Sequence, residues 1–338
     1  MNLSILYGFD DNYAPYAGVS MTSLFENNQD AEEITVYLAA LNVSQDNLDK
    51  FHRIAEQYGR KLALLETSQA IEQIKAYHCG TWNGSLAAWL RLFVLDQIPD
   101  SADYLIYLDS DTIIYNGLSG ILDSDLSAYP IAAVYDCLSF WSRFQLNFTT
   151  DESYYNAGVI VFNLNYWRKN NVILNMMSHL KENIERYSTL DQDLINDYFH
   201  GQILTLPPQY NVQSVLYAYS LKSYYSVYPW TPGVYYTSEE LRNALDRPVV
   251  LHFFRFLGDY PWQQGTNYHP AKSVYESWKQ KTLWKSHKGA PPKKELVFRL
   301  EKILYRCLPR GAFLRLFSWY TNRSIQKPSE LRNADNIK

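Results

Sequence analysis

The feature that most constrains this chain is the alternation of short apolar runs with helical patterns up to Tyr135. Runs of strand length lie at Leu3–Phe9, Ile34–Ala40, Leu62–Leu65, Asp103–Leu108 and Ile131–Tyr135. Helical patterns separate them at Tyr16–Phe25, Ser44–Tyr58 (with Ser44 as its N-cap) and Leu86–Leu95. Strands that alternate with helices form βαβ units around a largely parallel sheet, so the sequence predicts an α/β fold.

Composition narrows the class of protein. Apolar residues make up 47% and charged residues 20% of the 338 positions, which excludes disordered and fibrous chains. The three cysteines form no CxxC pair, which favours a reducing compartment. The N-terminus has no basic segment, so we expect no signal peptide. The stretch 198–221 has no Asp, Glu, Lys or Arg, but two prolines and the amides Gln209, Asn211 and Gln213 argue against a membrane span.

The charge of the chain is unevenly distributed. Residues 1–284 hold 18 Lys and Arg against 31 Asp and Glu, a net charge of −13, whereas residues 285–338 hold 13 against 4, a net charge of +9. An acidic body repels a phosphate backbone, so we expect no nucleic-acid partner. We predict a catalytic domain at 1–284 and a basic tail at 285–338.

Acidic residues follow three of the strand-like runs: Asp10-Asp11-Asn12, Asp109-Ser110-Asp111 and Asp136. Ligands of open α/β sheets bind outside the carboxyl ends of the strands. Asp109 and Asp111 alternate along an extended chain and so present two carboxylates to one side, which suits Mg²⁺ or Mn²⁺. A solvated turn is the commoner role of a bare DxD pair. No glycine-rich phosphate loop is present.

The segment Ile106-Tyr107-Leu108-Asp109-Ser110-Asp111 resembles the YLDxD motif of the retaining glycosyltransferases of family 8, which include bacterial lipopolysaccharide galactosyltransferases and glycogenin-like enzymes. Further segments follow the family's order over roughly residues 1–280: Asp10-Asp11-Asn12-Tyr13, Arg91-Leu92, Asn156-Ala157-Gly158, Asp191-Gln192-Asp193, and His252 followed by Pro261-Trp262. The resemblance implies a GT-A-type fold, a Rossmann-like mixed sheet flanked by helices, with a small C-terminal helical extension.

The resemblance also implies a role for each segment. Asp109, Asp111 and His252 would bind Mn²⁺ or Mg²⁺ on the diphosphate of a UDP-sugar, although a histidine in an apolar run is more often a core residue. A further set of residues would bind the nucleotide and the donor sugar: Asp10, Asp11, Asn12, Tyr13, Arg91, Asp136, Asn156, Ala157, Gly158 and Trp262. Asp191 and Gln192 would be catalytic. Gln192 is a poor nucleophile, so we expect it to position or stabilise, and Asp191 to be the carboxylate near the reaction centre.

One departure from the family pattern concerns the histidine motif. The family commonly has a lysine before the Pro-Trp pair, but Tyr260 stands there in this chain. A tyrosine supplies no positive charge, so Arg255 or Lys272 would have to replace it, or the phosphate contact is weaker.

Tyrosines gather between Tyr210 and Tyr236, where eight of them and Trp230 accompany a single charged residue, Lys222. Such rings either stack on the sugars of an acceptor or pack within the protein. The sequence leaves both interpretations open.

The tail contains two amphipathic patterns, Lys293–Arg306 and Ala312–Tyr320, among basic residues. Basic amphipathic helices bind anionic membrane surfaces, but they also pack on a domain or bind a partner. We favour a membrane surface and expect a cytoplasmic protein, peripheral at the inner face of the membrane.

The sequence therefore predicts a metal-dependent retaining hexosyltransferase. It would move glucose or galactose from UDP-glucose or UDP-galactose to a lipid- or protein-linked glycan acceptor. One alternative is a nucleotide-sugar or glycan-binding protein of the same fold that has lost transfer. A nucleotidyltransferase is disfavoured by the missing phosphate loop near Leu3–Asp11.

Overall fold

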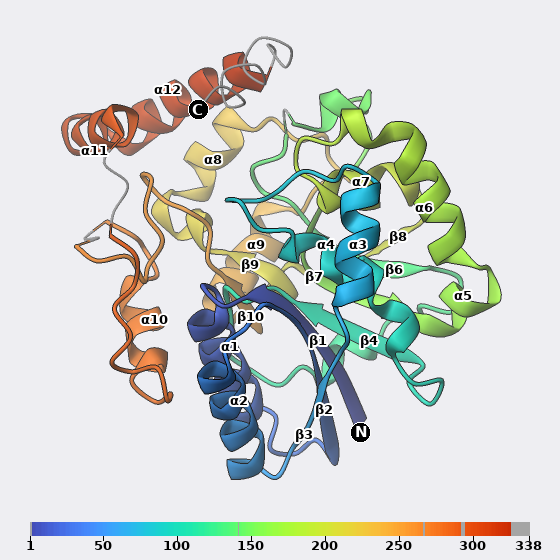
Figure 1. Cartoon of the computed structure of the whole chain (residues 1–338). Helices are drawn as coiled ribbons and strands as arrows, with labels where there is room; N and C mark the ends of the chain where they lie inside the picture. The colour runs from blue at the N-terminus through green and yellow to red at the C-terminus, as the bar shows by residue number, and fades with distance from the viewer. Residues whose placement is uncertain (1, 141, 266–267, 292–294, 326–338) are drawn as a thin grey trace.

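The computed structural model describes residues 2–140, 142–265, 268–291 and 295–325, and it is built on one large sheet with helices on both faces (Figure 1). The sheet has seven strands in the order β3-β2-β1-β4-β7-β6-β8. Their bounds are β1 (Asn2–Asp10), β2 (Glu33–Leu41), β3 (Lys61–Leu64), β4 (Tyr104–Leu108), β6 (Ile131–Tyr135), β7 (Tyr155–Asn163) and β8 (Ile203–Thr205). Strand β7 runs antiparallel to β4 and β6, and the other pairs are parallel. The predicted mixed α/β sheet is confirmed.

Helices and short 3₁₀ turns connect these strands. The helices are α1 (Ala14–Glu26), α2 (Gln45–Gln57), α3 (Ser68–Ala76), α4 (Ala87–Phe93), α5 (Leu164–Lys169), α6 (Val172–Asn183), α7 (Asp191–Tyr198), α8 (Leu221–Val227), α9 (Ser238–Asp246), α10 (Lys272–Lys279), α11 (Leu296–Cys307) and α12 (Arg310–Ile325). The 3₁₀ turns are η1 (Leu95–Gln97), η2 (Ser119–Leu122), η3 (Ser142–Leu146), η4 (Ile184–Arg186), η5 (Pro208–Asn211) and η6 (Ser214–Ala218).

The two faces of the sheet bury separate cores, as the period of two along a strand requires. On one face, Ile5 and Tyr7 of β1 pack in a cluster that includes residues of α1 and α2. On the other face, Leu6 packs in a cluster that includes residues of α3 and α4. Because helices cover both faces of the sheet, the strands are nearly continuous apolar runs. Such runs can be recognised in the sequence, so the predicted strands agree well with the structure.

A second, three-stranded sheet in the order β5-β10-β9 is what assembles the site. Its strands are β5 (Thr112–Ile114), β10 (Val250–His252) and β9 (Val212–Gln213). The antiparallel register of β5 and β10 sets His252 opposite Thr112, immediately after Asp111. Strands of two or three residues carry no readable periodicity, so sequence analysis did not foresee this sheet.

The start of α2 differs in one detail from the prediction. Ser44 is the N-cap residue, but its side chain does not cap the helix. Instead the Ser44 backbone and hydroxyl donate to Asp11 Oδ1 at 2.8 and 2.9 Å, and Asn47 Nδ2 donates to the same oxygen at 2.8 Å. The carboxylate of Asp11 thus holds the N-terminus of α2 against the end of β1.

The tyrosine-rich segment between Tyr210 and Tyr236 is mainly a packing element. Tyr224, Tyr228, Trp230 and Tyr235 are buried, and the rings of Trp230 and Tyr235 stack with centroids 4.4 Å apart. Buried rings cannot stack on a sugar, so the structure favours packing over an acceptor wall for these residues.

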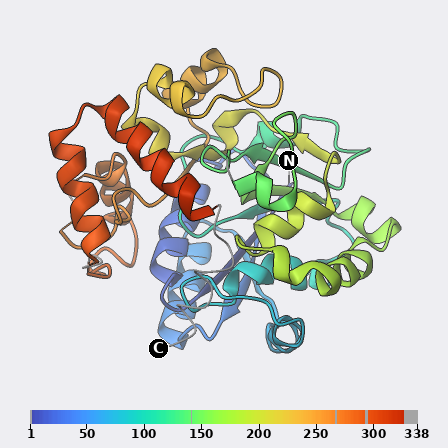
Figure 2. The same cartoon turned by 90° about the horizontal axis from the view of Figure 1, so that it is seen from above.

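The C-terminal segment forms the two expected helices, which lie together at one edge of the molecule beside α8 (Figures 1 and 2). Lys293 and Lys294, the predicted start of the first helix, lie outside the described residues. Helix α12 buries Phe313 and Leu314, while α11 leaves Leu300 and Ile303 more than half exposed. Among the described residues, no helix combines the length and apolar character needed to cross a bilayer.

Candidate active site

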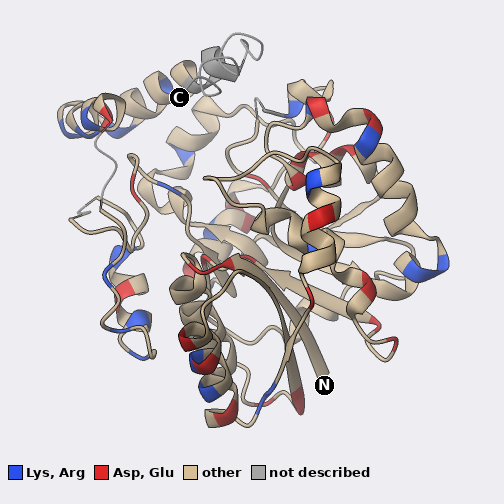
Figure 3. Cartoon of the chain, viewed as in Figure 1, with Lys and Arg blue, Asp and Glu red and all other residues tan. Residues whose placement is uncertain are grey.

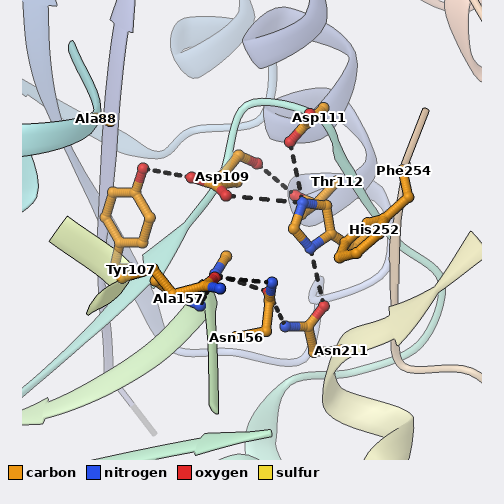
Figure 4. Close-up of polar contacts among 12 residues, drawn as sticks. Ala88, Tyr107, Asp109, Asp111, Thr112, Asn156, Ala157, Asn211, His252 and Phe254 are labelled. Carbon is orange, nitrogen blue, oxygen red and sulfur yellow. Dashed lines mark hydrogen bonds and ion pairs between the residues drawn. The ribbon is translucent and has the colours of Figure 1, made fainter. Parts of the chain in front are cut away.

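The predicted metal ligands come together at the carboxyl end of β4. One ligand atom from each of Asp109, Asp111 and His252 lies within 4.8 Å of the others (Figure 4). His252 Nε2 is 3.3 Å from Asp111 Oδ1 and 3.7 Å from Asp109 Oδ2. Two carboxylates and an imidazole form a donor set that suits a divalent cation with open coordination positions. These residues therefore fit a metal site.

His252 is held in the orientation that such a site requires. Its Nδ1 lies 3.0 Å from Asn211 Oδ1, which fixes the proton on Nδ1 and directs the Nε2 lone pair toward the aspartates. Burial opposes protonation of His252, but its hydrogen bond to Asp111 and the charge of Asp111 outweigh burial and raise its pKa. Burial raises the pKa of Asp111, and the charge of Asp109 adds to this rise. The carboxylates are thus crowded in a way that a cation would relieve.

Gly158 leaves the space that His252 occupies. A Cβ at this position would lie 2.2 Å from Cε1 of the imidazole and 2.9 Å from Asp109 Oδ2. Any side chain at Gly158 would therefore collide with two of the three candidate ligands.

The two oxygens of Asp109 face different partners. Oδ2 faces His252, whereas Oδ1 accepts a hydrogen bond from the hydroxyl of Tyr107 at 2.7 Å and lies 3.2 Å from Arg91 Nη2. The guanidinium also lies over the ring of Tyr107, 4.1 Å from its centroid. Tyr107 and Arg91 thus fix one edge of the carboxylate and leave the other toward the metal position.

Arg91 of α4 links Asp109 to Asp191, the first residue of α7. Its Nε is 2.8 Å from Asp191 Oδ2, but the N–H points to the carbonyl of Ala88 at 3.0 Å. Asp191 Oδ2 therefore accepts no hydrogen bond from the part of the chain that the structure describes. Burial raises the pKa of Asp191 to about 7, although Arg91 opposes the rise. A buried oxygen in this state is available to a ligand.

Next to this pair, side-chain amides form a connected network. Gln192 Oε1 accepts from the backbone N–H of Ala157 at 3.0 Å and from Asn156 Nδ2 at 3.1 Å. Asn156 Nδ2 also donates to Asp136 Oδ2 at 2.9 Å, and Asn156 Oδ1 accepts from Asn211 Nδ2 at 2.7 Å. The network joins the β6 end, β7 and α7 to the partner of His252, so a shift in one member moves the others.

Leu190, the residue before Asp191, has a strained backbone. Its φ of 57° and ψ of −127° lie in a region that residues with a Cβ rarely adopt. This backbone conformation leads directly into Asp191, the first residue of α7.

The end of β1 contributes the predicted nucleotide-binding residues. Asp10 Oδ1 accepts from the backbone N–H of Tyr13 at 3.2 Å, and Asn12 is exposed. Burial raises the pKa of Tyr13, and the charge of Asp111 adds to this, so its hydroxyl lies within the field of the metal site. Oδ1 of Asp11 is engaged by Ser44 and Asn47 at the N-terminus of α2, as described above. Whether these residues bind a nucleotide stays a prediction.

Trp262 is buried rather than exposed in the site. It stacks between Tyr16 and Tyr260, at 4.3 and 4.6 Å between ring centroids. In this arrangement Trp262 supports Tyr260 from behind, and its contact with a ligand stays a prediction.

Sequence analysis did not assign a site role to Tyr107, Asn211 or Tyr154. Tyr154 donates to Asp193 Oδ1 at 2.6 Å and lies 3.3 Å from Gln192 Nε2. Asn211 carried a readable signal, because an amide in an apolar stretch without acidic or basic residues needs a buried polar partner. The sequence around Tyr107 and Tyr154 contains no signal for a site role other than the motif residues next to them.

Comparison with known proteins agrees with this geometry. General stress protein A of Bacillus subtilis is 26% identical over 280 residues, which cover 81% of this chain and 92% of that protein. Lipopolysaccharide 1,3-galactosyltransferase of Salmonella typhimurium is 24% identical over 289 residues, covering 83% and 79%. The solved galactosyltransferase LgtC, in complex with donor and acceptor sugar analogues, shares the fold with a TM-score of 0.65 at 21% identity, covering 85% and 99%.

The family match is more extensive than any single motif. The model of the family described as "Glycosyl transferase family 8" matches residues 4–265, which contain every candidate ligand and catalytic residue named above. This chain belongs to glycosyl transferase family 8.

Proposed function

We propose that this family 8 protein is a divalent-metal-dependent retaining hexosyltransferase. It transfers glucose or galactose from a UDP-sugar to a lipid- or protein-linked glycan acceptor. The observation that carries the proposal is the proximity of two groups. One is the Asp109, Asp111 and His252 cluster, and the other is the buried Asp191, one oxygen of which accepts no hydrogen bond from any described residue.

Asp109, Asp111 and His252 would hold Mn²⁺ or Mg²⁺. Such an ion neutralises a diphosphate and stabilises the charge that develops on it as a leaving group. The protein supplies the rest: Asn211 keeps Nε2 of His252 free, and Arg91 with Tyr107 fixes Asp109. The donor set contains hard oxygens and one imidazole, which suits either ion.

Asp191 and Gln192 are the proposed catalytic residues. The Asp191 oxygen faces Arg91 in a buried position, where a carboxylate stabilises positive charge on the anomeric carbon as the sugar leaves. Gln192 is neutral and accepts two hydrogen bonds from the Asn156-Ala157 segment, so it positions the sugar rather than attacking it. Asp136, Asn156 and Arg91 would meet the sugar hydroxyls, and the Asp10–Tyr13 segment would meet the uridine.

The donor and acceptor are proposed from relatives. The Salmonella relative is a lipopolysaccharide 1,3-galactosyltransferase, and an Escherichia coli protein that is 28% identical over 226 residues is a lipopolysaccharide 1,2-glucosyltransferase. A hexose donor and a glycan acceptor follow by similarity. The competing interpretation, a binding protein without transfer, rests on Tyr260 in place of lysine.

The proposal includes a location at the inner face of the membrane. Helix α11 exposes Leu296, Leu300 and Ile303 to 79%, 55% and 56%, and basic residues accompany them (Figure 3). Apolar side chains beside Lys and Arg bind anionic lipid surfaces, with each basic residue contributing about 1 kcal/mol. A lipid-linked acceptor would be met at that surface.

Release of UDP from a donor panel tests the function. With Mn²⁺, we expect the full-length protein to release UDP from UDP-glucose or UDP-galactose and not from their N-acetyl forms. The Asp111→Ala variant should release none, and the product should keep the anomeric configuration of the donor by NMR. Binding of UDP without release from any donor and acceptor would favour the binding protein instead.

A further inference from the structure

The loop of residues 253–262, here called the site loop, connects the metal cluster to the C-terminal helix α11. It leaves β10 directly after His252, where the backbone N–H of Phe253 donates to the carbonyl of Asp111 at 2.9 Å. It then forms a tight turn, in which the backbones of Phe256 and Asp259 exchange hydrogen bonds of 2.8 and 3.0 Å. A shift of this loop would therefore also displace the neighbouring residues Asp111 and His252.

Helix α11 packs on that turn through one face. A Cβ at Gly258, whose φ is +81°, would lie 2.4 Å from the ring of Phe298. Lys302 Nζ is 2.6 Å from Oδ2 of the buried Asp259. The ring of Tyr305 meets Phe256 edge to face at 5.2 Å. Spacings of three and four residues place Phe298, Lys302 and Tyr305 on the same side of the helix.

The opposite side of α11 is exposed at Leu296, Leu300 and Ile303. The inner side holds the site loop through an aromatic ring and through an ion pair in which Asp259 is buried and Lys302 is partly exposed. Loss of Lys302 would leave the buried charge of Asp259 without its partner, which is costly. The Asp259–Lys302 pair therefore fixes the register of α11 on the loop.

The site loop also carries Arg255, whose guanidinium interacts with Tyr260, Phe298 and Glu301 but keeps one donor unused by the described residues. The Nε of Arg255 is buried and has no hydrogen bond within the described part of the chain. Its guanidinium lies 5.3 Å from the ring centroid of Tyr260 and 5.9 Å from that of Phe298. Burial raises the pKa of Tyr260, the charge of Asp111 adds to this rise, and the charge of Arg255 opposes it.

The charges at the site call for a second positively charged group beside the metal. A divalent cation on Asp109 and Asp111 has its charge cancelled by the two carboxylates, so it leaves the charge of a diphosphate largely uncompensated. Arg91 is already engaged by Asp109 and Asp191. Arg255 is three residues from His252 and offers a buried donor, which makes it better placed than Lys272 at the start of α10.

We infer that Arg255 supplies the second positive charge for the donor diphosphate and that α11, through Phe298 and the Asp259–Lys302 pair, holds Arg255 in place. The C-terminal helix is then a structural part of the donor site. This inference rests on the proposed function, because it presupposes a nucleoside diphosphate beside the metal cluster. It also resolves the missing lysine at Tyr260, since the cation comes from five residues earlier on the same loop.

Binding of UDP and of uridine to the full-length protein with Mn²⁺, by calorimetry and ligand-detected NMR, tests the inference. Arg255→Ala should weaken UDP on the order of tenfold to a hundredfold, because it removes a charge-assisted contact, and leave uridine unchanged. Arg255→Lys should recover part of the loss. Lys302 lies outside the donor site, yet Lys302→Met should weaken UDP binding. Substitution of the exposed Arg299 on the same helix, Arg299→Met, should leave UDP binding unchanged.

Each outcome separates the inference from the proposed function. If the wild-type protein binds no UDP in the presence of metal, the proposed function fails and the inference fails with it. If the wild type binds UDP and Arg255→Ala binds it equally well, only the inference fails. Equal loss of UDP and uridine in Arg255→Ala would mean a structural role, which contradicts a phosphate contact. Unchanged UDP affinity in Lys302→Met would refute the claim that α11 holds Arg255 in place.

Discussion

Gly158 and His252 are in such close contact that no other residue fits at position 158. A Cβ there would lie 2.2 Å from Cε1 of the imidazole, well inside van der Waals contact. The backbone of β7 thus forms one wall of the metal cluster, and the histidine rests directly on it.

Gly158→Ala should therefore displace His252 and weaken Mn²⁺ binding by about tenfold to a hundredfold, as loss of an outer-shell partner does. Titration calorimetry of the protein with Mn²⁺ measures this. Gly117→Ala is the matched control, because a Cβ at Gly117 would meet nothing closer than 3.8 Å. Equal affinities in the two variants would show that Gly158 does not shape the site.

Asn211 orients His252 through its side-chain oxygen, so its two substitutions should behave differently. Asn211→Ala removes the acceptor for Nδ1 and should weaken Mn²⁺ by about tenfold. Asn211→Asp keeps that acceptor, loses only the donation to Asn156, and should bind Mn²⁺ at least as well as the wild type. Calorimetry decides, and equal weakening in both variants would mean that orientation of the imidazole is not the cause.

His269 makes the stability of the protein depend on pH. Burial lowers its pKa to about 4, and its Nε2 lies 2.8 Å from the carbonyl of Phe254 on the site loop. Because the unfolded chain binds this proton more readily, stability is full above about pH 6.5 and falls as the pH drops toward 4, by roughly 3 kcal/mol. His269→Gln should show a shallower loss in urea unfolding between pH 7 and 4.5. A slope equal to that of the wild type would contradict this assignment.

The outer face of α11 should carry membrane binding. Replacing both Leu300 and Ile303 with Gln should reduce sedimentation with anionic phosphatidylserine vesicles severalfold, because the apolar contact is lost. Leu174→Gln on α6 is the control, since Leu174 is exposed to 68% and remote in sequence from the tail. Equal sedimentation of all proteins would refute a membrane role for this face.

The large sheet and the Asp109–Asp111 pair were predicted from local patterns, whereas His252 was assigned as a ligand only through the family resemblance. Buried strands such as Leu3–Phe9 are continuous apolar runs, and Asp109 and Asp111 are two residues apart on one chain end. The contacts that orient them come from distant segments: Asn211 lies 41 residues from His252 and 55 from Asn156. No local pattern encodes such pairs, nor the packing of Phe298 on Gly258.

The tyrosine-rich segment shows the opposite limit. Its composition suited sugar stacking, but Tyr224 and Tyr235 are buried, and the hydroxyl of Tyr224 donates to the carbonyl of Cys137 at 2.8 Å. Aromatic content alone cannot distinguish a surface for sugars from a core, because the same amphipathic ring serves both.

Calorimetry of UDP binding with and without Mn²⁺, for the wild type and for Asp111→Ala, tests the metal-dependent donor site. We expect UDP to bind the wild type with Mn²⁺, chelation of the metal to abolish most of the affinity, and Asp111→Ala to behave like the chelated protein. UDP affinity that is independent of metal and unchanged in Asp111→Ala would contradict the metal-dependent donor site.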